Sequence, residues 1–308
     1  MTPTLRVADL SESDLHSRLS REGLWLKSGP FSLHIQSRER AVSHAIACLY
    51  RDHALSASDF ADFHVEIARA AGVRRWLKPQ IQFHLDGRTP FKPLPHAQSF
   101  AMLEWGLNWC IATYCQQFLV IHAAVVERNG MAAILPAPPG SGKSTLTAAL
   151  IQRGWRLCSD ELTLIDPGTG KVVALARPVN LKNDSIDIIR AFEPTAVFGP
   201  EYPDTHKGRV AHLRPPRQSV ERASEAAKPR WVVFPQWAAG EPLNLTALQR
   251  SAAFIQLAEN AFNYNMLGET GFRTLADTID RCDCLALRYS RLDDAIRAFD
   301  GLADEAMA

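Results

Sequence analysis

The chain has 308 residues, of which 46% are apolar and 22% charged, so it is long enough for one or two domains with a buried core, and its composition excludes a disordered protein. Its 34 basic and 33 acidic residues leave a formal net charge of +1, without the basic excess typical of nucleic-acid-binding proteins. No apolar stretch approaches the ~20 residues of a membrane helix, no secretory signal is expected at the N-terminus, and six scattered cysteines favour a reduced, cytoplasmic setting.

The first predicted region covers residues 1–118 and mixes strands with helices. Two short apolar runs flank a Ser-Gly-Pro turn, which predicts two strands, and apolar residues at helical spacing predict a helix that closes the region. The proline-rich residues 88–96 predict a loop. No flexible linker follows the last helix, so we expect this α+β region to pack on the rest of the chain. The predicted strands are 24–27, 31–36, 63–68 and 81–86, and the predicted helices are 39–50 and 97–117.

The second predicted region, residues 119–308, opens with two apolar runs around Asn129-Gly130, a strong hairpin signal. The second arm leads into a glycine-rich loop and then a helix over 146–154. Residues 199–230 are rich in proline and arginine and predict a long loop, a mobile flap that closes over a nucleotide. The other predicted elements are strands over 155–166, 171–176, 231–234 and 284–289, and helices over 252–267, 271–281 and 292–302.

The strongest chemical signal is the segment APPGSGKST, which fits a phosphate-binding loop with alanine in place of the first glycine. Its glycines let successive backbone N–H groups point at phosphate oxygens, and the helix that follows presents an N-terminus that favours anions. The alternative is a chance glycine-rich turn, but a strand before and a helix after is the context the motif requires. We therefore expect ATP and Mg²⁺ here, with Lys143 on the phosphates and Ser144 on the metal ion. The predicted nucleotide-binding residues are Pro139, Gly140, Ser141, Gly142, Lys143, Ser144 and Thr145.

Two acidic residues, Asp160 and Glu161, follow Lys143 by only 17 and 18 residues. A carboxylate beside the γ-phosphate can ligate Mg²⁺ or take a proton from an attacking hydroxyl, so Ser144, Asp160 and Glu161 are the candidate metal ligands. The alternative is a solvated strand end. If the strand runs regularly through the pair, the two side chains point to opposite faces and are not interchangeable.

Four further residues are candidates with a plain structural alternative. His122 precedes the hairpin arm that feeds the loop, where it is either a catalytic or phosphate-contacting group or a structural histidine. Lys182 follows the next strand and is either a phosphate ligand or a surface lysine. Lys207 and Arg209, in the segment THKGR, are predicted to contact phosphates, and the alternative is a solvated charged loop. Cys282 and Cys284 lack a second Cys/His pair, so we interpret them as core residues.

Several segments together resemble the HPr kinase-related kinase A family, a group of HPr kinase-like proteins. The resemblance spans nearly the full length. It is carried by IHAAVV, PAPPGSGKST, GWRLCSDEL and RPVNLK, and by GLWLKSGPF, LEWGLNWC, THKGRVAHLRPP, FNYNMLGETGF and LRYSRLDDAI.

The resemblance implies a P-loop core like the C-terminal domain of HPr kinase, related to phosphoenolpyruvate carboxykinase, within a mixed α/β fold. By motif position it places Asp160 as the base that activates a serine hydroxyl, with Glu161 beside it. The long HPr kinase signature segment is absent, which argues against HPr as the acceptor and against the reverse phosphorylase activity. The resemblance instead implies a peptide or small-protein acceptor, and it leaves open an accompanying peptide chaperone-like protein and a homo-oligomer.

The sequence thus predicts an ATP-dependent serine kinase. Two alternatives stay open. A kinase of a small-molecule hydroxyl would use the same catalytic residues with a different acceptor pocket. A nucleotide-binding ATPase or switch subunit would have no acceptor at all and would use the flap as its moving element.

Overall fold

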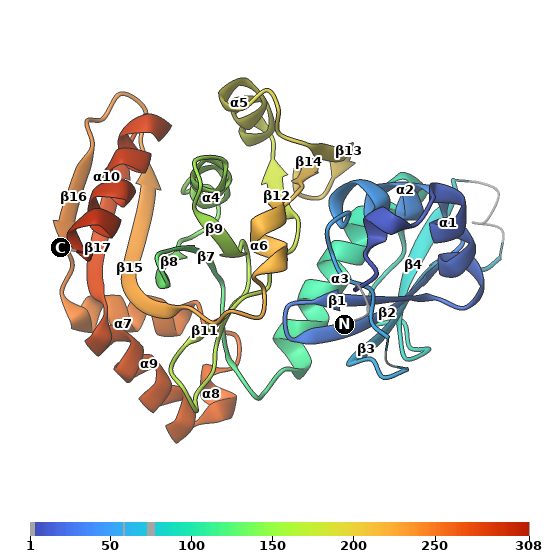
Figure 1. Ribbon diagram of the computed structural model, residues 1–308, viewed down its shortest axis with the longest axis horizontal. Coiled ribbons are helices and arrows are strands. Elements are labelled where there is room, and N and C mark those ends of the chain that lie inside the picture. The colour runs from blue at the N-terminus through green and yellow to red at the C-terminus, as the bar shows by residue number, and fades with distance from the viewer. Residues whose placement is uncertain (1–3, 58, 73–77, 308) are drawn as a thin grey trace.

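The computed structural model describes residues 4–57, 59–72 and 78–307, and it confirms the predicted mixed α/β fold. No secretory signal is expected at the N-terminus, and residues 1–3 of that segment lie outside these ranges. The N-terminal sheet with its helices lies to one side, and the strands and helices around the phosphate loop lie to the other (Figure 1).

The N-terminal part is a five-stranded sheet whose strands follow chain order, with all neighbours antiparallel except the parallel pair β2–β3. Its apolar side chains alternate with polar ones along each strand, and the apolar side joins one hydrophobic cluster with the three helices. The elements are η1 (Val7–Asp9), α1 (Glu12–Arg21), β1 (Leu24–Ser28), β2 (Phe31–Ser37), α2 (Arg40–Leu49), β3 (Phe63–Arg69), β4 (Gln80–Leu85), β5 (Leu94–Pro95), η3 (His96–Gln98) and α3 (Ser99–Tyr114).

The rest of the chain is organised around a six-stranded sheet of order β16-β17-β15-β8-β7-β9, in which β8, β15 and β17 are parallel. Two three-stranded sheets, β11-β10-β6 and β12-β14-β13, complete the part of the chain that the structure describes. The strands are β6 (Leu119–Ile121), β7 (Ala123–Arg128), β8 (Met131–Pro136), β9 (Arg156–Ser159), β10 (Thr163–Ile165), β11 (Val172–Val173), β12 (Val179–Lys182), β13 (Phe198–Thr205), β14 (Gly208–Leu213), β15 (Lys228–Trp237), β16 (Asn244–Ala247) and β17 (Asp283–Tyr289).

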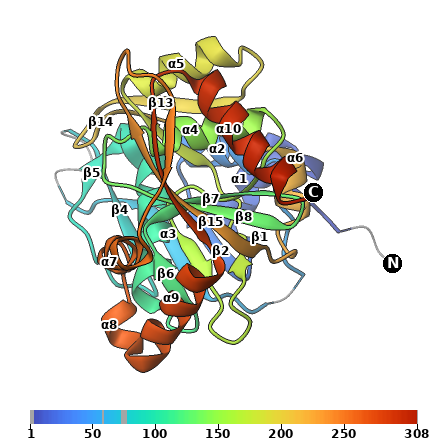
Figure 2. The same cartoon turned by 90° about the vertical axis from the view of Figure 1, so that its left-hand side faces the viewer.

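Helices cover both faces of the six-stranded sheet, which is why consecutive residues along the middle of β7 and β8 are apolar and buried. Ala124 and Val126 of β7 join a cluster with α4, α5 and α10, while Ala123 and Val125 join one with α7 and α9. Figure 2 shows these two groups of helices above and below the strands. The helices are α4 (Lys143–Gln152), α5 (Asp184–Phe192), α6 (Arg217–Glu221), α7 (Arg250–Glu259), α8 (Tyr264–Leu267), α9 (Glu269–Arg281) and α10 (Leu292–Glu305).

The β7–β8 hairpin confirms the Asn-Gly prediction. Asn129 and Gly130 both have positive φ, at 56° and 79°, as a two-residue turn with the twist of the flanking strands requires. The arm β8 ends at Pro136 and passes directly into the phosphate loop, so the hairpin fixes where that loop starts.

The two parts of the chain share a hydrophobic cluster. Leu162, Leu164 and Leu175 of the second part pack with buried side chains of the N-terminal sheet and α3. This continuity agrees with the absence of a flexible linker after α3, whereas the domain boundary at residue 118 remains a prediction.

The predicted long loop over 199–230 is wrong in its secondary structure. Residues 198–213 form the hairpin β13–β14, and α6 and the start of β15 follow. Pro203 misled the prediction, but β13 is an edge strand, where a missing N–H donor is tolerated. The tip of the hairpin carries His206 and Lys207, whose side chains lie against Trp105 of α3. Whether this hairpin moves as a flap remains a prediction.

Four smaller expectations are also wrong. The segment 155–166 is two strands with a bend at residues 160 and 161, and 171–176 is a strand only over Val172–Val173. The proline-rich loop at 88–96 contains β5 and the start of η3. The single helix over 252–267 is divided into α7 and α8 because the buried Asn263 bonds the main chain of Val120 and Phe118, which requires the chain to leave the helix. Helices α1 and α5 were not predicted.

Cys282 and Cys284 are buried, in agreement with their interpretation as core residues, and the six cysteines are free thiols. None of the described helices combines the length and the apolar character needed to cross a bilayer.

Candidate active site

The phosphate loop curls between β8 and α4 with the two glycines in the left-handed region. Gly140 has φ 86° and Gly142 has φ 87°, a conformation that L residues with a side chain rarely adopt. A Cβ atom on Gly142 would also come within 2.7 Å of the Tyr289 hydroxyl. Both the backbone conformation and this close contact therefore require glycine at position 142. Helix α4 begins at Lys143, so the N–H groups of its first turn have no acceptor within the helix, an arrangement that favours an anion at this end.

Lys143 and His122 meet beneath this loop. Lys143 is only 8% exposed, and its Nζ lies 3.4 Å from Nε2 of His122. Burial and the charge of Lys143 lower the pKa of His122 to about 4, so the imidazole is neutral and accepts a hydrogen bond from the ammonium group. The structure thus brings His122 to the lysine of the loop, where it orients that side chain.

Asp160 lies directly after β9 and is 6% exposed. Burial, and then the charge of Glu161, raise the pKa of Asp160 to about 6, while the charge of Lys143 acts in the opposite direction. Its Oδ2 accepts a hydrogen bond of 3.0 Å from the backbone N–H of Asn180. Its Oδ1 is buried and accepts no hydrogen bond of normal geometry from the described residues, although the Ser144 hydroxyl lies close enough to stabilise the carboxylate.

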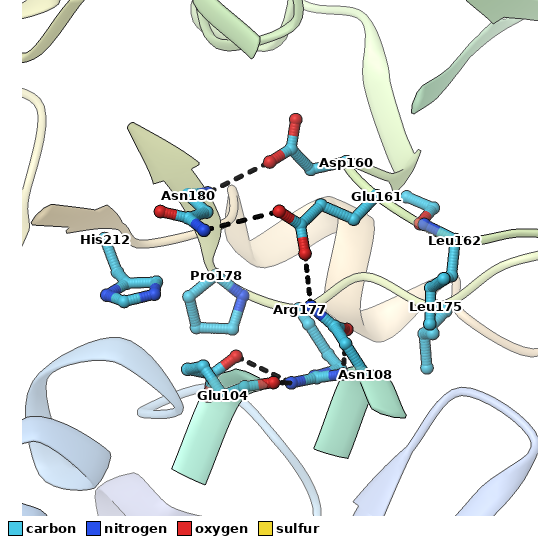
Figure 3. A pocket seen from close by; sticks show the side chains of 11 residues that line it. Glu104, Asn108, Asp160, Glu161, Leu162, Leu175, Arg177, Pro178, Asn180 and His212 are labelled. Atoms are coloured by element: carbon cyan, nitrogen blue, oxygen red, sulfur yellow. Dashed lines mark hydrogen bonds and ion pairs between the residues drawn. The ribbon is translucent and has the colours of Figure 1, made fainter. Parts of the chain in front are cut away.

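Glu161 does not point away from Asp160, because a regular strand through the pair, the condition for opposite faces, is not present. Strand β9 ends at Ser159, the chain bends at the acidic pair, and both carboxylates line one cavity (Figure 3). Both oxygens of Glu161 accept hydrogen bonds, one from Nδ2 of Asn108 and one of 3.3 Å from Nδ2 of Asn180. Burial acts to raise the pKa of Glu161, but nearby lysines outweigh it and the pKa lies below its usual value.

A buried ion pair between Glu104 of α3 and Arg177 supports Glu161. Arg177 and Glu104 are 6% and 3% exposed, and their side chains are joined at 2.7 Å. Arg177 also donates to Oδ1 of Asn108 at 2.7 Å, and the Tyr50 hydroxyl donates to Glu104 at 2.7 Å. Figure 3 shows the continuous series of contacts that runs from Glu104 through Arg177 and Asn108 to Glu161.

The three other predicted cations divide into two kinds. Lys182, at the end of β12, and Lys207, at the hairpin tip, both lower the pKa of Glu161 by their charge, so they lie on the side of the acidic pair. Arg209 instead pairs with Asp187, and its Nη1 lies 3.4 Å from Glu201. The structure therefore does not bring Arg209 into the lining of the cavity.

Sequence reasoning missed several residues of the cavity. Its lining includes Glu104 and Asn108 from α3 and His212 from β14. Arg177 and Asn180 stand in the segment RPVNLK, which carries the resemblance, and this was the available signal for them. Glu104 and Asn108 stand in LEWGLNWC and His212 in THKGRVAHLRPP, two further segments that carry the resemblance, so the same signal was available for them. The full lining is Glu104, Asn108, Ser159, Asp160, Glu161, Leu162, Leu175, Arg177, Pro178, Asn180 and His212.

The donors at Asp160 suit Mg²⁺ that arrives with a nucleotide. Magnesium in such sites takes one or two carboxylates besides phosphate oxygens, and the unpaired Oδ1 of Asp160 with the Ser144 hydroxyl offers that partial set. Glu161 fits less well because both of its oxygens are already bonded. Among the described residues, no three His, Cys, Asp or Glu side chains converge as a preformed metal site.

Comparisons with known proteins add little. No family model and no curated protein matches the chain. Among solved structures, the HPr(Ser) kinase/phosphatase from Coxiella burnetii is similar at 12% identity and a TM-score of 0.27, over 60% of this chain and 98% of that one. A likeness at this TM-score carries no weight for the activity, which therefore has to be inferred from the residues of the site.

The buried ion pair gives a first prediction. Glu104→Gln leaves Arg177 as a buried charge without its partner, so the free energy of unfolding should fall by about 3–5 kcal/mol. The double variant Glu104→Leu with Arg177→Met removes both charges and should lose much less. Urea unfolding followed by circular dichroism measures both. Equal losses in the two variants would contradict the assignment of the pair.

The raised pKa of Asp160 gives a second prediction. Because the folded chain binds this proton more tightly than the unfolded chain, ionisation of Asp160 costs stability once the pH rises through about 6. Asp160→Asn should therefore raise the free energy of unfolding at pH 7.5 by about 1–3 kcal/mol, and the gain should shrink as the pH falls toward 4. Glu161→Gln is the matched control. The pKa of Glu161 is lowered, so its loss should destabilise the fold at pH 7.5.

Proposed function

We propose that the protein is an ATP-dependent kinase that transfers the γ-phosphoryl group of ATP to a hydroxyl, with serine of a peptide or small protein as the acceptor. The single observation that carries the proposal is the position of Asp160. A buried carboxylate with an unpaired oxygen lies in electrostatic contact with the lysine of a phosphate-binding loop. The sequence resemblance to HPr kinase-related kinases supports the same reaction.

The phosphate loop supplies binding. The glycine-rich loop and the N-terminus of α4 favour an anion, and Lys143 adds a positive charge beside them. Burial lowers the pKa of Lys143, and the charges of Asp160 and Glu161 act in the opposite direction. His122 holds that lysine in place. When bound, Mg²⁺ neutralises charge on the phosphates, and Asp160 and Ser144 are the residues that would hold it.

Asp160 supplies the chemistry on the acceptor. The carboxylate of Asp160 orients the acceptor hydroxyl and receives the hydroxyl proton as the new bond from oxygen to phosphorus forms. The bond between the γ-phosphorus and the bridging oxygen breaks, and ADP leaves with that oxygen. A pKa of about 6 suits this role, because the carboxyl is ionised at neutral pH yet more basic than an exposed aspartate.

ATP binding is tested at Lys143. Lys143→Ala should weaken ATP binding by about 1.5–3 kcal/mol, the usual contribution of a hydrogen bond to a charged group. Isothermal titration calorimetry with ATP and Mg²⁺ measures the change. Lys171→Ala on the 166–171 turn is a control that should bind as the wild type does. Equal ATP affinity in the Lys143 variant would contradict the assignment of the loop.

Phosphoryl transfer is tested at Asp160. Asp160→Asn should lower transfer of ³²P from γ-labelled ATP by roughly 10²–10⁴-fold, as loss of a general base does, with a much smaller change in ATP affinity. In the wild type, kcat/KM should rise with pH through about 6 and then level off. Peptides and small proteins encoded beside the gene are the acceptors to test first.

Two outcomes would contradict this role. Near-wild-type transfer by Asp160→Asn together with complete loss in Glu161→Gln would move the base to Glu161. Steady ATP hydrolysis with no transfer to any hydroxyl acceptor would favour a nucleotide-driven switch instead of a kinase.

A further inference from the structure

Several buried polar atoms without partners line the cavity beside Asp160. His212 is 1% exposed, and neither of its ring nitrogens makes a hydrogen bond within the described part of the chain. Oδ1 of Asn180 and Oδ1 of Asp160 are likewise buried and unbonded there. All three residues line the same cavity (Figure 3). Buried polar atoms are normally paired, so three such residues around one space point to a ligand.

The unpaired atoms define what that ligand must offer. Asp160 and Asn180 present acceptor oxygens, and the orientation of the Asn180 amide is set because its Nδ2 donates to Glu161. Burial lowers the pKa of His212, so its ring is neutral and presents one donor and one acceptor. A hydroxyl with a neighbouring N–H group, as in a serine residue, can donate to Asp160 and to Asn180 and accept from His212.

The charges of the lining residues themselves argue against an anionic ligand inside the cavity. Among the described lining residues, Arg177 is the only arginine or lysine, and it is already paired with Glu104. Asp160 and Glu161 add negative charge. Lys143, Lys182 and Lys207 act on the acidic pair from outside this lining, so a carboxylate or phosphate inside the cavity would contact the two acids rather than a lining cation. The cavity is partly open to solvent, which gives a ligand access to its polar atoms.

The cavity also joins the two parts of the chain. Glu104 and Asn108 come from α3 of the N-terminal region, whereas Asp160, Asn180 and His212 come from the part that carries the phosphate loop. The ring of His212 lies edge-on to Phe100 of α3, with centroids 5.4 Å apart, so α3 also fixes the position of that histidine.

We infer that this cavity is the acceptor subsite, that it accepts an uncharged hydroxyl group next to an amide N–H, and that His212 is a specificity-determining residue. The identification of the bound group as a phosphoryl acceptor rests on the proposed kinase function. Helix α3 thereby gives the N-terminal region a direct part in acceptor recognition.

Binding is measured without phosphoryl transfer, so that this inference and the kinase function can fail separately. The probe is the blocked peptide acetyl-Ala-Ser-Ala-amide, titrated into the full chain with Mg²⁺ and a non-hydrolysable ATP analogue while the imidazole signals are followed by NMR. The His212 signals should shift on addition of the peptide. The peptides with Ala in place of Ser, or with Asp on both sides of Ser, should bind at least tenfold more weakly.

Two variants of His212 and one control variant test the role of this residue. His212→Phe keeps a ring against Phe100 but removes both nitrogens, so it should weaken binding of the serine peptide by roughly five- to tenfold. It should also melt a few degrees higher, because an unpaired buried polar group is gone. His212→Gln restores one donor and one acceptor and should bind within about threefold of wild type. His84→Phe, on the exposed side of the N-terminal sheet, is the matched control and should bind unchanged.

Each remaining outcome is decisive. Unchanged peptide affinity in His212→Phe, equal binding of the acidic peptide, or equal binding of glycerol and N-acetylserinamide would overturn the inference. Binding that depends on His212 with no phosphoryl transfer to the peptide would support the cavity and contradict the kinase function. Transfer to a peptide that is insensitive to His212 would support the kinase and overturn the cavity.

Discussion

The buried pair of Glu104 and Arg177 is the interaction on which the site depends. Two charges withdrawn from water lose several kcal/mol of solvation each, and such a pair seldom adds net stability over apolar residues of the same size. In this structure the ion pair positions other side chains of the site. Arg177 holds Asn108, and Asn108 holds Glu161, so one ion pair fixes both sides of the cavity. The N-terminal region therefore shapes the site through side chains that touch no phosphate.

The acidic pair shows how neighbouring residues of one type acquire different properties. Asp160 keeps one oxygen free, and burial raises its pKa to about 6. Glu161 has both oxygens bonded, and the charges of Lys182, Lys207 and Lys143 outweigh burial and lower its pKa. The difference comes from the groups around each carboxylate. Glu161 thus provides a fixed negative charge, and Asp160 is the group that can exchange a proton.

What the sequence could predict was local in the chain. The hairpin at Asn129-Gly130, the loop at Gly140–Thr145 and the acidic pair one helix later are patterns whose physics lies within a few residues. The residues that complete the site could not be found in this way. Asn108 and His212 are more than 100 positions apart and line one cavity because His212 of β14 packs against Phe100 of α3. The direction of Glu161 was missed for a related reason, since a bend of two residues replaces regular strand geometry there.

Without a ligand, the buried unpaired polar atoms of the cavity lower the stability of the fold, and this loss of stability bears on function. A carboxylate oxygen, an amide oxygen and a whole imidazole ring are buried without partners, although apolar residues at these positions would remove the penalty. Next to them, both oxygens of Glu161 are bonded, and Arg177 donates to Asn108 and Glu104. These bonds hold the lining in place, as is expected where a fold keeps polar atoms ready for a group that arrives with the substrate.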